Sequence, residues 1–211
     1  MTEKKNDRMM TPVGRLVNAS LWVKDTYKDE KGREATPQYK IEMAFEPKDI
    51  NDLEDAVVAA AIEEWGAGAE KDYDNGTIRS PIIDGDQLAD ERVKRGKAGD
   101  AYKGKVVLRA NTQFNRHGED GPGGIYVCDE KAEAIDFANQ SKVYPGSYGI
   151  AVINISPYSV DRQRGVKLYL AGYQFVKDGE RLRSNDVAGI FKPMIGGGTG
   201  APAAGRRARR A

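Results

Sequence analysis

Aromatic and basic side chains occur together in two polar segments of the sequence. The tyrosines are Tyr27 and Tyr158, and the cations beside them are Lys28, Lys31, Arg33, Arg162 and Arg164. Single-stranded nucleic acid requires this combination, because cations follow the phosphates while aromatic rings stack on bases of any sequence. The pattern therefore predicts sequence-tolerant binding of a single strand rather than catalysis.

A second set of candidates lies on predicted strands, at positions that alternate with apolar residues and therefore point away from the core. These residues are Arg15, Trp22, Lys40, Lys105, Arg109, Lys167 and Tyr169. We expect the rings to stack on bases and the cations to contact phosphates. Trp22 has an alternative role, because a ring at this position could also cap the core.

One group of acidic residues permits an enzymatic interpretation. Asp84 and Asp86 flank Gly85, with Asp90 and Asp100 nearby. Two close carboxylates could hold a divalent cation, as in metal-dependent nucleases. Asp-Gly-Asp is also common turn chemistry, because Asp tolerates tight turns and Gly adopts positive φ. The turn is the preferred interpretation, and a nuclease stays open as a rival to single-strand binding.

Other catalytic and cofactor signatures are missing. The sequence has no glycine-rich loop ending in Gly-Lys-Ser or Gly-Lys-Thr and no nucleophile elbow. His117, the single histidine, lies among polar loop residues, and the glycines at 196–200 lead into no helix. We therefore expect no cofactor, no metal and no enzymatic activity. A protein that binds only other proteins is a further alternative.

Composition limits the class of protein. The formal net charge is +1, so nucleic-acid binding must depend on local patches rather than on overall positive charge. Cys128 is the single cysteine, which excludes an internal disulfide and fits a reducing compartment. No apolar stretch approaches the roughly 20 residues that span a bilayer. A cytoplasmic protein without a membrane partner is expected.

Hydropathy patterns predict the elements that carry these residues. Period-two alternation indicates long strands at 13–23, 39–46, 103–112, 148–155 and 165–176. A helix is expected at 49–65, with Asp49 as N-cap and Gly66 as C-cap. Residues 66–100 are expected to be irregular apart from a short helix near 88–94. A short strand at 125–127 and a short helix at 130–138 complete the prediction.

This order of elements predicts a mainly β protein, a five-stranded OB-like Greek-key barrel with helical insertions and disordered termini. Its predicted parts are a flexible segment at 1–11, an OB-fold single-stranded-DNA-binding domain at 12–192 and a disordered Gly/Ala/Arg-rich tail at 193–211. In such a barrel, the loops containing Tyr27 and Tyr158 border the binding groove.

Six short motifs recur in the order of a known family. They are Gly14-Arg15-Leu16, Pro37-Gln38-Tyr39-Lys40, Asp84-Gly85-Asp86, Tyr102-Lys103-Gly104, Val143-Tyr144-Pro145-Gly146, and Gly165-Val166 with Gln174. Over residues 13–182 the chain thereby resembles phage-encoded single-stranded-DNA-binding proteins with an OB-fold core, long catalogued as a domain of unknown function. The resemblance implies a non-catalytic accessory of DNA replication or recombination that coats single strands in the host bacterial cytoplasm. The preference for DNA over RNA rests on this resemblance alone.

The C-terminus departs from the pattern of many single-strand binders, which end in an acidic tail that recruits replication proteins. This chain carries Arg206, Arg207, Arg209 and Arg210 instead. A basic tail would add phosphate contacts and steepen the salt dependence of binding. Recruitment of partners by an acidic tail is therefore not expected, although replication or recombination proteins stay candidate partners.

Overall fold

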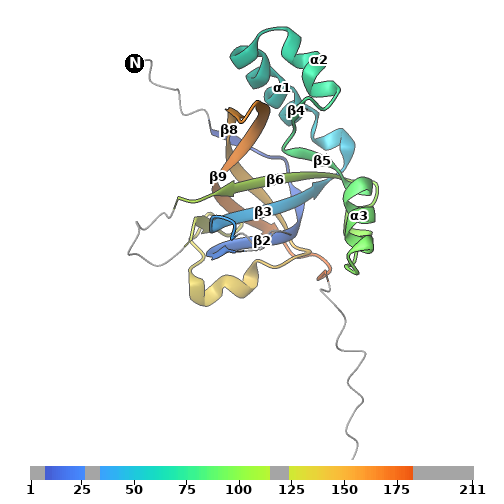
Figure 1. Ribbon diagram of the computed structural model, residues 1–211. Coiled ribbons are helices and arrows are strands. Elements are labelled where there is room, and N and C mark those ends of the chain that lie inside the picture. The colour runs from blue at the N-terminus through green and yellow to red at the C-terminus, as the bar shows by residue number, and fades with distance from the viewer. Residues whose placement is uncertain (1–7, 27–33, 115–123, 183–211) are drawn as a thin grey trace, which may run out of the picture.

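The computed structural model describes residues 8–26, 34–114 and 124–182 (Figure 1). The described part is mainly β. Its strands are β1 (Arg8–Met10), β2 (Gly14–Asp25), β3 (Gln38–Phe45), β4 (Ile78–Arg79), β5 (Ile82–Asp84), β6 (Val106–Thr112), β7 (Tyr126–Cys128), β8 (Tyr148–Val160) and β9 (Gln163–Lys177). Its helices are α1 (Asn51–Trp65), α2 (Gly68–Asp74) and α3 (Gly85–Lys94), with 3-10 turns η1 (Pro47–Asp49), η2 (Asp100–Tyr102) and η3 (Phe137–Lys142).

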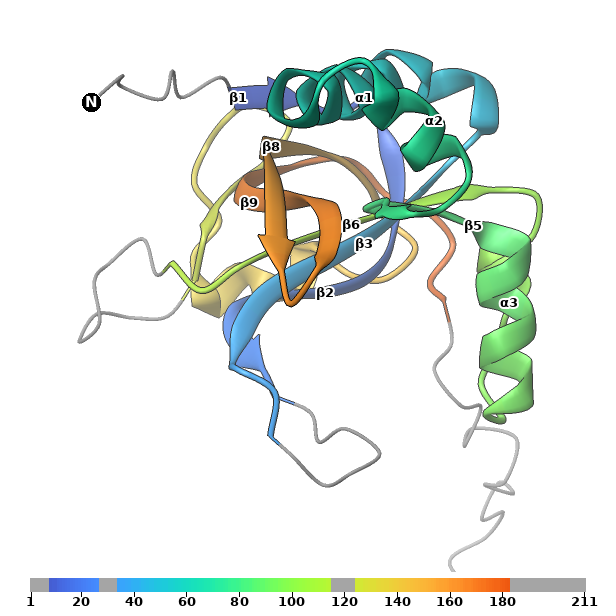
Figure 2. The same cartoon turned by 45° about the horizontal axis from the view of Figure 1, so that its top comes forward.

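The five long strands pair in a cycle. Antiparallel pairings join β2 to β3, β3 to β6, β9 to β8 and β8 to β2, and a parallel pairing joins β6 to β9. Figure 2 looks down on this cycle, with α1 and α2 above it. All nine described strands belong to one sheet, and the short strands are additions to it rather than members of the cycle. The predicted positions of the long strands agree with these bounds to within a few residues, except that β8 runs to Val160 and β6 begins at Val106.

The core lies inside the cycle, where alternate residues of neighbouring strands meet. Ile41 on β3, Leu108 and Ala110 on β6, and Leu168 on β9 are all buried there. Because the side chains of a strand alternate between its two faces, the residue on either side of each of these four along its own strand faces outward. Outward residues at one end of β3 and β6 are covered in turn, since Ala44 and Val107 pack with Leu88 of α3 in a second cluster.

Helix α1 covers one end of the cycle. It buries Leu53, Val57 and Ala61, which recur at helical spacing, against the core. Gly66, at φ +82°, ends the helix as predicted. The predicted N-cap at Asp49 was wrong, because Asp49 belongs to η1 and the buried Ile50 precedes the helix without a side-chain cap.

The stretch at 66–100 is more regular than its polar composition predicted. Helix α2 buries Ala69 and Tyr73, β4 lies parallel to the start of β9, and β5 pairs with β6. The isolated apolar residues Ile78 and Ile82 pack on the core in these short elements. Tertiary contacts therefore stabilise segments that are too short to show a hydropathy period.

The predicted helix at 130–138 is absent from that position, and a 3-10 segment, η3, lies later in the chain. The Asp129 carboxylate accepts backbone N–H groups from Lys131 and Glu133, which closes a turn in place of a helix. Asp136 then caps η3 by accepting the N–H of Asn139 at 3.0 Å. Both aspartates thus satisfy backbone donors locally, which competes with helix formation.

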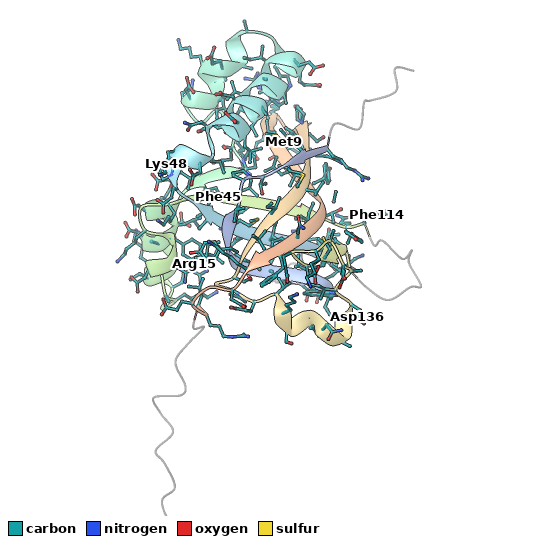
Figure 3. The ribbon with its side chains drawn as sticks, turned by 180° about the vertical axis from the view of Figure 1, so that it is seen from behind. Met9, Arg15, Phe45, Lys48, Phe114 and Asp136 are labelled. Carbon is teal, nitrogen blue, oxygen red and sulfur yellow. The ribbon has the colours of Figure 1, made fainter. Side chains whose placement is uncertain are left out.

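The predicted flexible segment at 1–11 was too long, because residues 8–10 form β1 on the edge of β8 (Figure 3, where Met9 is labelled). The buried Thr11 fixes the end of this strand. Its N–H donates to Ala151 O at 2.9 Å, and its hydroxyl accepts the N–H of Ala151 at 3.0 Å. The polar side chains of this segment suggested that it is flexible, but its hydrogen bonds are made to a strand 140 residues away in the chain, which the local sequence does not reveal.

Candidate nucleic-acid interface

Cross-strand register assembles one row of polar and aromatic side chains across the outside of the cycle. Ser20 pairs with Lys40, Lys40 with Asn111, Asn111 with Tyr169, and Tyr169 with Asn154. Directly paired residues place their side chains on the same face of a sheet. Five strands therefore contribute neighbouring side chains to one surface.

A ladder on β8 and β9 extends this row. Ser156 pairs with Lys167 and Tyr158 pairs with Gly165, so all these positions share the face of Tyr169. On β6, Arg109 precedes Asn111 by two residues and faces the same way. We call this surface the central face; its members are Ser20, Lys40, Arg109, Asn111, Asn154, Ser156, Tyr158, Lys167 and Tyr169.

Tyr169 and Lys167 form the part of the central face best suited to a single strand. Tyr169 is 41% exposed, and the Lys167 ammonium lies over its ring, 4.7 Å from the centroid. Partial burial lowers the pKa of Lys167, since it removes water from the charged form. Within the described ranges, Lys167 has no carboxylate partner. A ring and an ammonium free to meet a phosphate thus lie side by side.

The other predicted strand lysines and Arg109 already pair with acids. Lys40 pairs with Asp25, Lys105 Nζ donates to Glu46 Oε1 at 2.5 Å, and Arg109 Nε donates to Glu42 Oε1 at 2.9 Å. The hydrogen bond and charge of Lys105 lower the pKa of Glu46. A phosphate that approaches such a pair meets a nearly neutral group, so these cations attract DNA less than free ones.

Glu42 is also coupled to Tyr102. The Tyr102 hydroxyl donates to Glu42 Oε2 at 3.4 Å. Burial, together with the nearby Glu42 charge, raises the pKa of Tyr102 to about 12. The phenol therefore stays protonated. The Glu42 carboxylate thus accepts one hydrogen bond from Tyr102 and one from Arg109.

Two predicted phosphate contacts are engaged in holding the fold together. Arg15 Nη2 donates to Glu180 O at 2.9 Å, which ties β2 to the segment after β9. Arg164 donates to Asp72 Oδ2 of α2 at 2.5 Å and lies 5.6 Å from the Trp65 ring centroid of α1. As DNA contacts, both residues stay predictions, and each would have to leave a protein partner.

Two predicted stacking residues are half-buried. Trp22 packs against the core, beside the backbone of Gly124. Tyr158 covers Gly165, where an added Cβ would lie 2.6 Å from the Tyr158 hydroxyl. Arg162 is exposed in the turn between β8 and β9, at φ +65°. Of the stacking candidates that the structure describes, Tyr169 presents the most open ring.

The remaining predicted residues lie outside the described ranges, namely Tyr27, Lys28, Lys31 and Arg33. The ends of their segment are described, since Asp25 pairs with Gln38. Asp25 and Gln38 are the strand residues that flank this stretch of chain, and Gln38 lies two residues before Lys40 on β3. His117 also lies outside the described ranges.

Two residues near the interface were missed by the sequence analysis as site candidates. Asn111 occupies the middle of the row, and its buried Oδ1 accepts no hydrogen bond from any described residue. Phe114 lies just beyond β6 and is 72% exposed (Figure 3). The outward position of Asn111 and the aromatic character of Phe114 were the available signals. Side-chain amides can hydrogen-bond bases, and an exposed ring can stack on them.

The Asp84-Gly85-Asp86 motif is a structural turn. Asp84 caps α3, its Oδ1 accepting the N–H groups of Asp86 at 2.7 Å and Gln87 at 3.3 Å. Asp86 Oδ1 accepts the N–H of Gly104 at 2.8 Å. An added Cβ at Gly85 would lie 2.1 Å from Tyr102 O, so the backbone approach requires glycine. The spacing that resembled a metal site is explained by these contacts.

Within the described ranges, no three metal-ligating side chains come together, and no helix is long and apolar enough to cross a membrane. Cys128 is a free thiol that is buried, and burial raises its pKa. Its thiol is thereby kept in the less reactive neutral form.

Comparison with known proteins identifies relatives. A protein family described as "Enterobacter phage Enc34, ssDNA-binding protein" matches residues 9–189. No curated protein sequence matches the chain.

Solved structures share the fold. The single-stranded DNA-binding protein from bacteriophage Enc34, in complex with ssDNA, has a TM-score of 0.57 at 14% identity, covering 83% of this chain and 89% of that one. Gp2.5, a single-stranded DNA binding protein encoded by bacteriophage T7, has a TM-score of 0.56 at 16% identity, covering 90% of this chain and 97% of that one. The same arrangement of strands thus occurs in chains with very different sequences.

Proposed function

The chain belongs to the family of the Enterobacter phage Enc34 ssDNA-binding protein, and from this premise we propose that it binds single-stranded DNA on the central face without catalysing a reaction. The observation that carries the proposal is the adjacency of Tyr169 and Lys167 in a row contributed by five strands. The related Enc34 structure was solved in complex with ssDNA. DNA coating in phage replication or recombination is the corresponding role.

Binding would exchange one contact of Tyr169 for another. A base stacked on the ring displaces the Lys167 ammonium, which then turns to the neighbouring phosphate. Base stacking contributes about 1 to 3 kcal/mol, whereas an exposed cation–π contact contributes about 0.5 to 1 kcal/mol. The exchange therefore favours the bound strand, and Lys167 gains a phosphate in addition.

The cycle of β2, β3, β6, β9 and β8 corresponds in our proposal to the five-stranded barrel of an OB fold, within a domain at 12–192. In that fold the ligand crosses the second and third strands, between the first and last hairpin loops. Here these strands are β3 and β6, and the loops are 26–37 and 161–162. The predicted residues Tyr27, Lys28, Lys31, Arg33 and Arg162 would then flank the central face.

The corresponding compartment is the host bacterial cytoplasm, where replication or recombination proteins are available as partners.

Titration of labelled oligo-dT and of duplex DNA of equal length, at several salt concentrations, tests the proposal. We expect tighter binding of the single strand and a linear fall of log affinity with log salt, because phosphate binding releases counterions. Equal affinity for both DNAs, or none for either, would refute it.

Absence of catalysis is tested separately. Incubation of DNA with the protein and Mg²⁺ or Mn²⁺ should leave the DNA intact, since Asp84 and Asp86 are occupied by backbone donors. Cleavage that disappears in Asp86→Ala would instead establish the nuclease.

A further inference from the structure

Helices α1 and α2 form an acidic end of the molecule. Residues 51–74 contain eight Asp and Glu residues and one lysine, and of these acids Asp72 is paired with Arg164. A groove of about 370 Å³ lies between the two helices. Half-buried Val58 and Ile62 line it, together with four carboxylates, those of Glu54, Asp55, Glu70 and Asp74. The groove therefore combines an apolar strip with carboxylates that pair with no cation among the described residues.

The C-terminal end of α3, together with the turn that follows it, has the opposite character. Residues 92–97 contain four cations and no acid. Arg92 is held in place, because its Nε donates to Ala98 O at 2.9 Å and its guanidinium lies over the Tyr102 ring. Lys94, Arg95 and Lys97 are exposed and have no carboxylate partner within the described ranges. Val93, among them, is 59% exposed.

The two surfaces match in both charge and polarity. An exposed valine flanked by cations faces solvent at α3, and an apolar strip flanked by carboxylates faces solvent between α1 and α2. Opposite potentials steer two surfaces together and set their register, while a small apolar contact at the centre excludes water. Neither surface contributes a residue to the central face.

One copy cannot make this contact with itself. The last turn of α3 points away from α1 and α2 in both views, and both elements are parts of one folded body (Figures 1 and 2). The occupant of the groove must therefore belong to another molecule. A head-to-tail contact between two different surfaces of identical chains forms an open array unless the rotation between copies closes it into a ring.

We infer that the groove between α1 and α2 binds residues 92–97 of a second copy of this chain, the C-terminal end of α3 and the turn after it, so that copies line up head to tail along a DNA strand. The inference rests on the proposed function for its setting. Because the central face is left open by this contact, each copy in the array can hold its own stretch of DNA. The array makes binding cooperative on long strands and leaves binding of a single site unchanged.

The test compares binding to a short oligo-dT that accommodates one copy with binding to long poly-dT. The double variant Glu54→Lys/Asp55→Lys reverses charge in the groove, and Glu63→Lys/Glu64→Lys is its control, with the same charge change on exposed α1 residues outside the groove. We expect cooperativity on poly-dT to fall about tenfold in the groove variant relative to the control. Affinity for the short oligonucleotide should be equal in the two.

Charge exchange sharpens the test. Lys94→Glu/Arg95→Glu alone should also abolish cooperativity, and its combination with Glu54→Lys/Asp55→Lys should restore it. Equal cooperativity in the groove variant and its control, or no restoration by the combination, would overturn the inference. If the unaltered protein does not bind the short oligonucleotide, the proposed function is overturned instead. In that event, sedimentation without DNA at low salt tests the inference. The inference requires that the unaltered protein self-associates and that the groove variant does not.

Discussion

The Asp84-Gly85-Asp86 turn and the central face were both candidates for chemistry, and they differ in what their polar groups already bind. In the turn, the carboxylates of Asp84 and Asp86 accept backbone N–H groups. On the central face, the Tyr169 ring is open, and Lys167 lies over that ring with no carboxylate partner in the part of the chain that the structure describes. A polar cluster binds a ligand readily when its groups lack protein partners, since each partner would have to be replaced.

The largest expected effect tests the structural side of this comparison. Gly85→Ala should lower the free energy of unfolding by about 3 kcal/mol or more, because the new methyl group collides with backbone that cannot move alone. Gly68→Ala is the control, since its Cβ meets nothing within 4 Å. Urea denaturation of both variants measures the difference. An unchanged stability for Gly85→Ala would mean that the turn is not held as described.

Removing the open ring tests the binding side. Tyr169→Ala should weaken oligo-dT binding by about 1 to 3 kcal/mol, which is roughly 5- to 150-fold, because stacking on this ring is lost. Phe137→Ala, which removes an exposed ring on η3, should leave affinity unchanged. Fluorescence titration at fixed salt gives both values. Similar losses in the two variants would contradict a special role for Tyr169.

A smaller effect separates free cations from paired ones. Lys167→Ala should reduce the slope of log affinity against log salt by about 0.7, the value for one contact to a single strand. Arg109→Ala should change the slope less, because the Arg109 guanidinium already pairs with Glu42. Titrations at four or more salt concentrations provide the slopes. If Arg109→Ala had the larger effect, pairing in the free protein would be a poor guide to DNA contacts.

The smallest expected effect concerns pH. Burial lowers the pKa of Lys167, so its charge is lost at a lower pH than that of an ordinary lysine. A phosphate favours the charged form, and affinity should therefore fall as the pH rises through this pKa. Lys167→Arg keeps its charge at alkaline pH, so a plot of its oligo-dT affinity against pH should be flatter there. If the plots for the unaltered protein and for Lys167→Arg run parallel, Lys167 does not contact the phosphate.

The long strands were predictable because each carries its own signal. In β3, Tyr39, Ile41 and Met43 alternate with polar residues, and this period of two appears wherever one face of a strand is buried. The long strands and α1 were found at nearly their observed positions for this reason. Short elements such as β4 and α2 contain too few residues to show a period, and only the packing of their own Ile78 and Tyr73 on the core reveals them.

The candidate site was predictable in its residue types and only partly in its geometry. Outward positions on strands identified Lys40, Lys167 and Tyr169, which the register then brings to one surface. The same rule selected Arg15, and the loop pattern selected Arg164; their partners Glu180 and Asp72 lie 165 and 92 residues away in the chain. No local pattern contains information about a partner at that distance.

The sequence by itself determined the mainly β character, the positions of the long strands and the presence of aromatic residues and cations on their outward faces. These properties depend on neighbouring residues, because the alternation of a strand is local. Only the tertiary structure decided which cations are paired with carboxylates, that Asp84 and Asp86 hold a turn, and that Lys167 lies over Tyr169. These properties depend on which strands meet and in what register, and hydrogen bonds between distant segments are made only when the chain has folded.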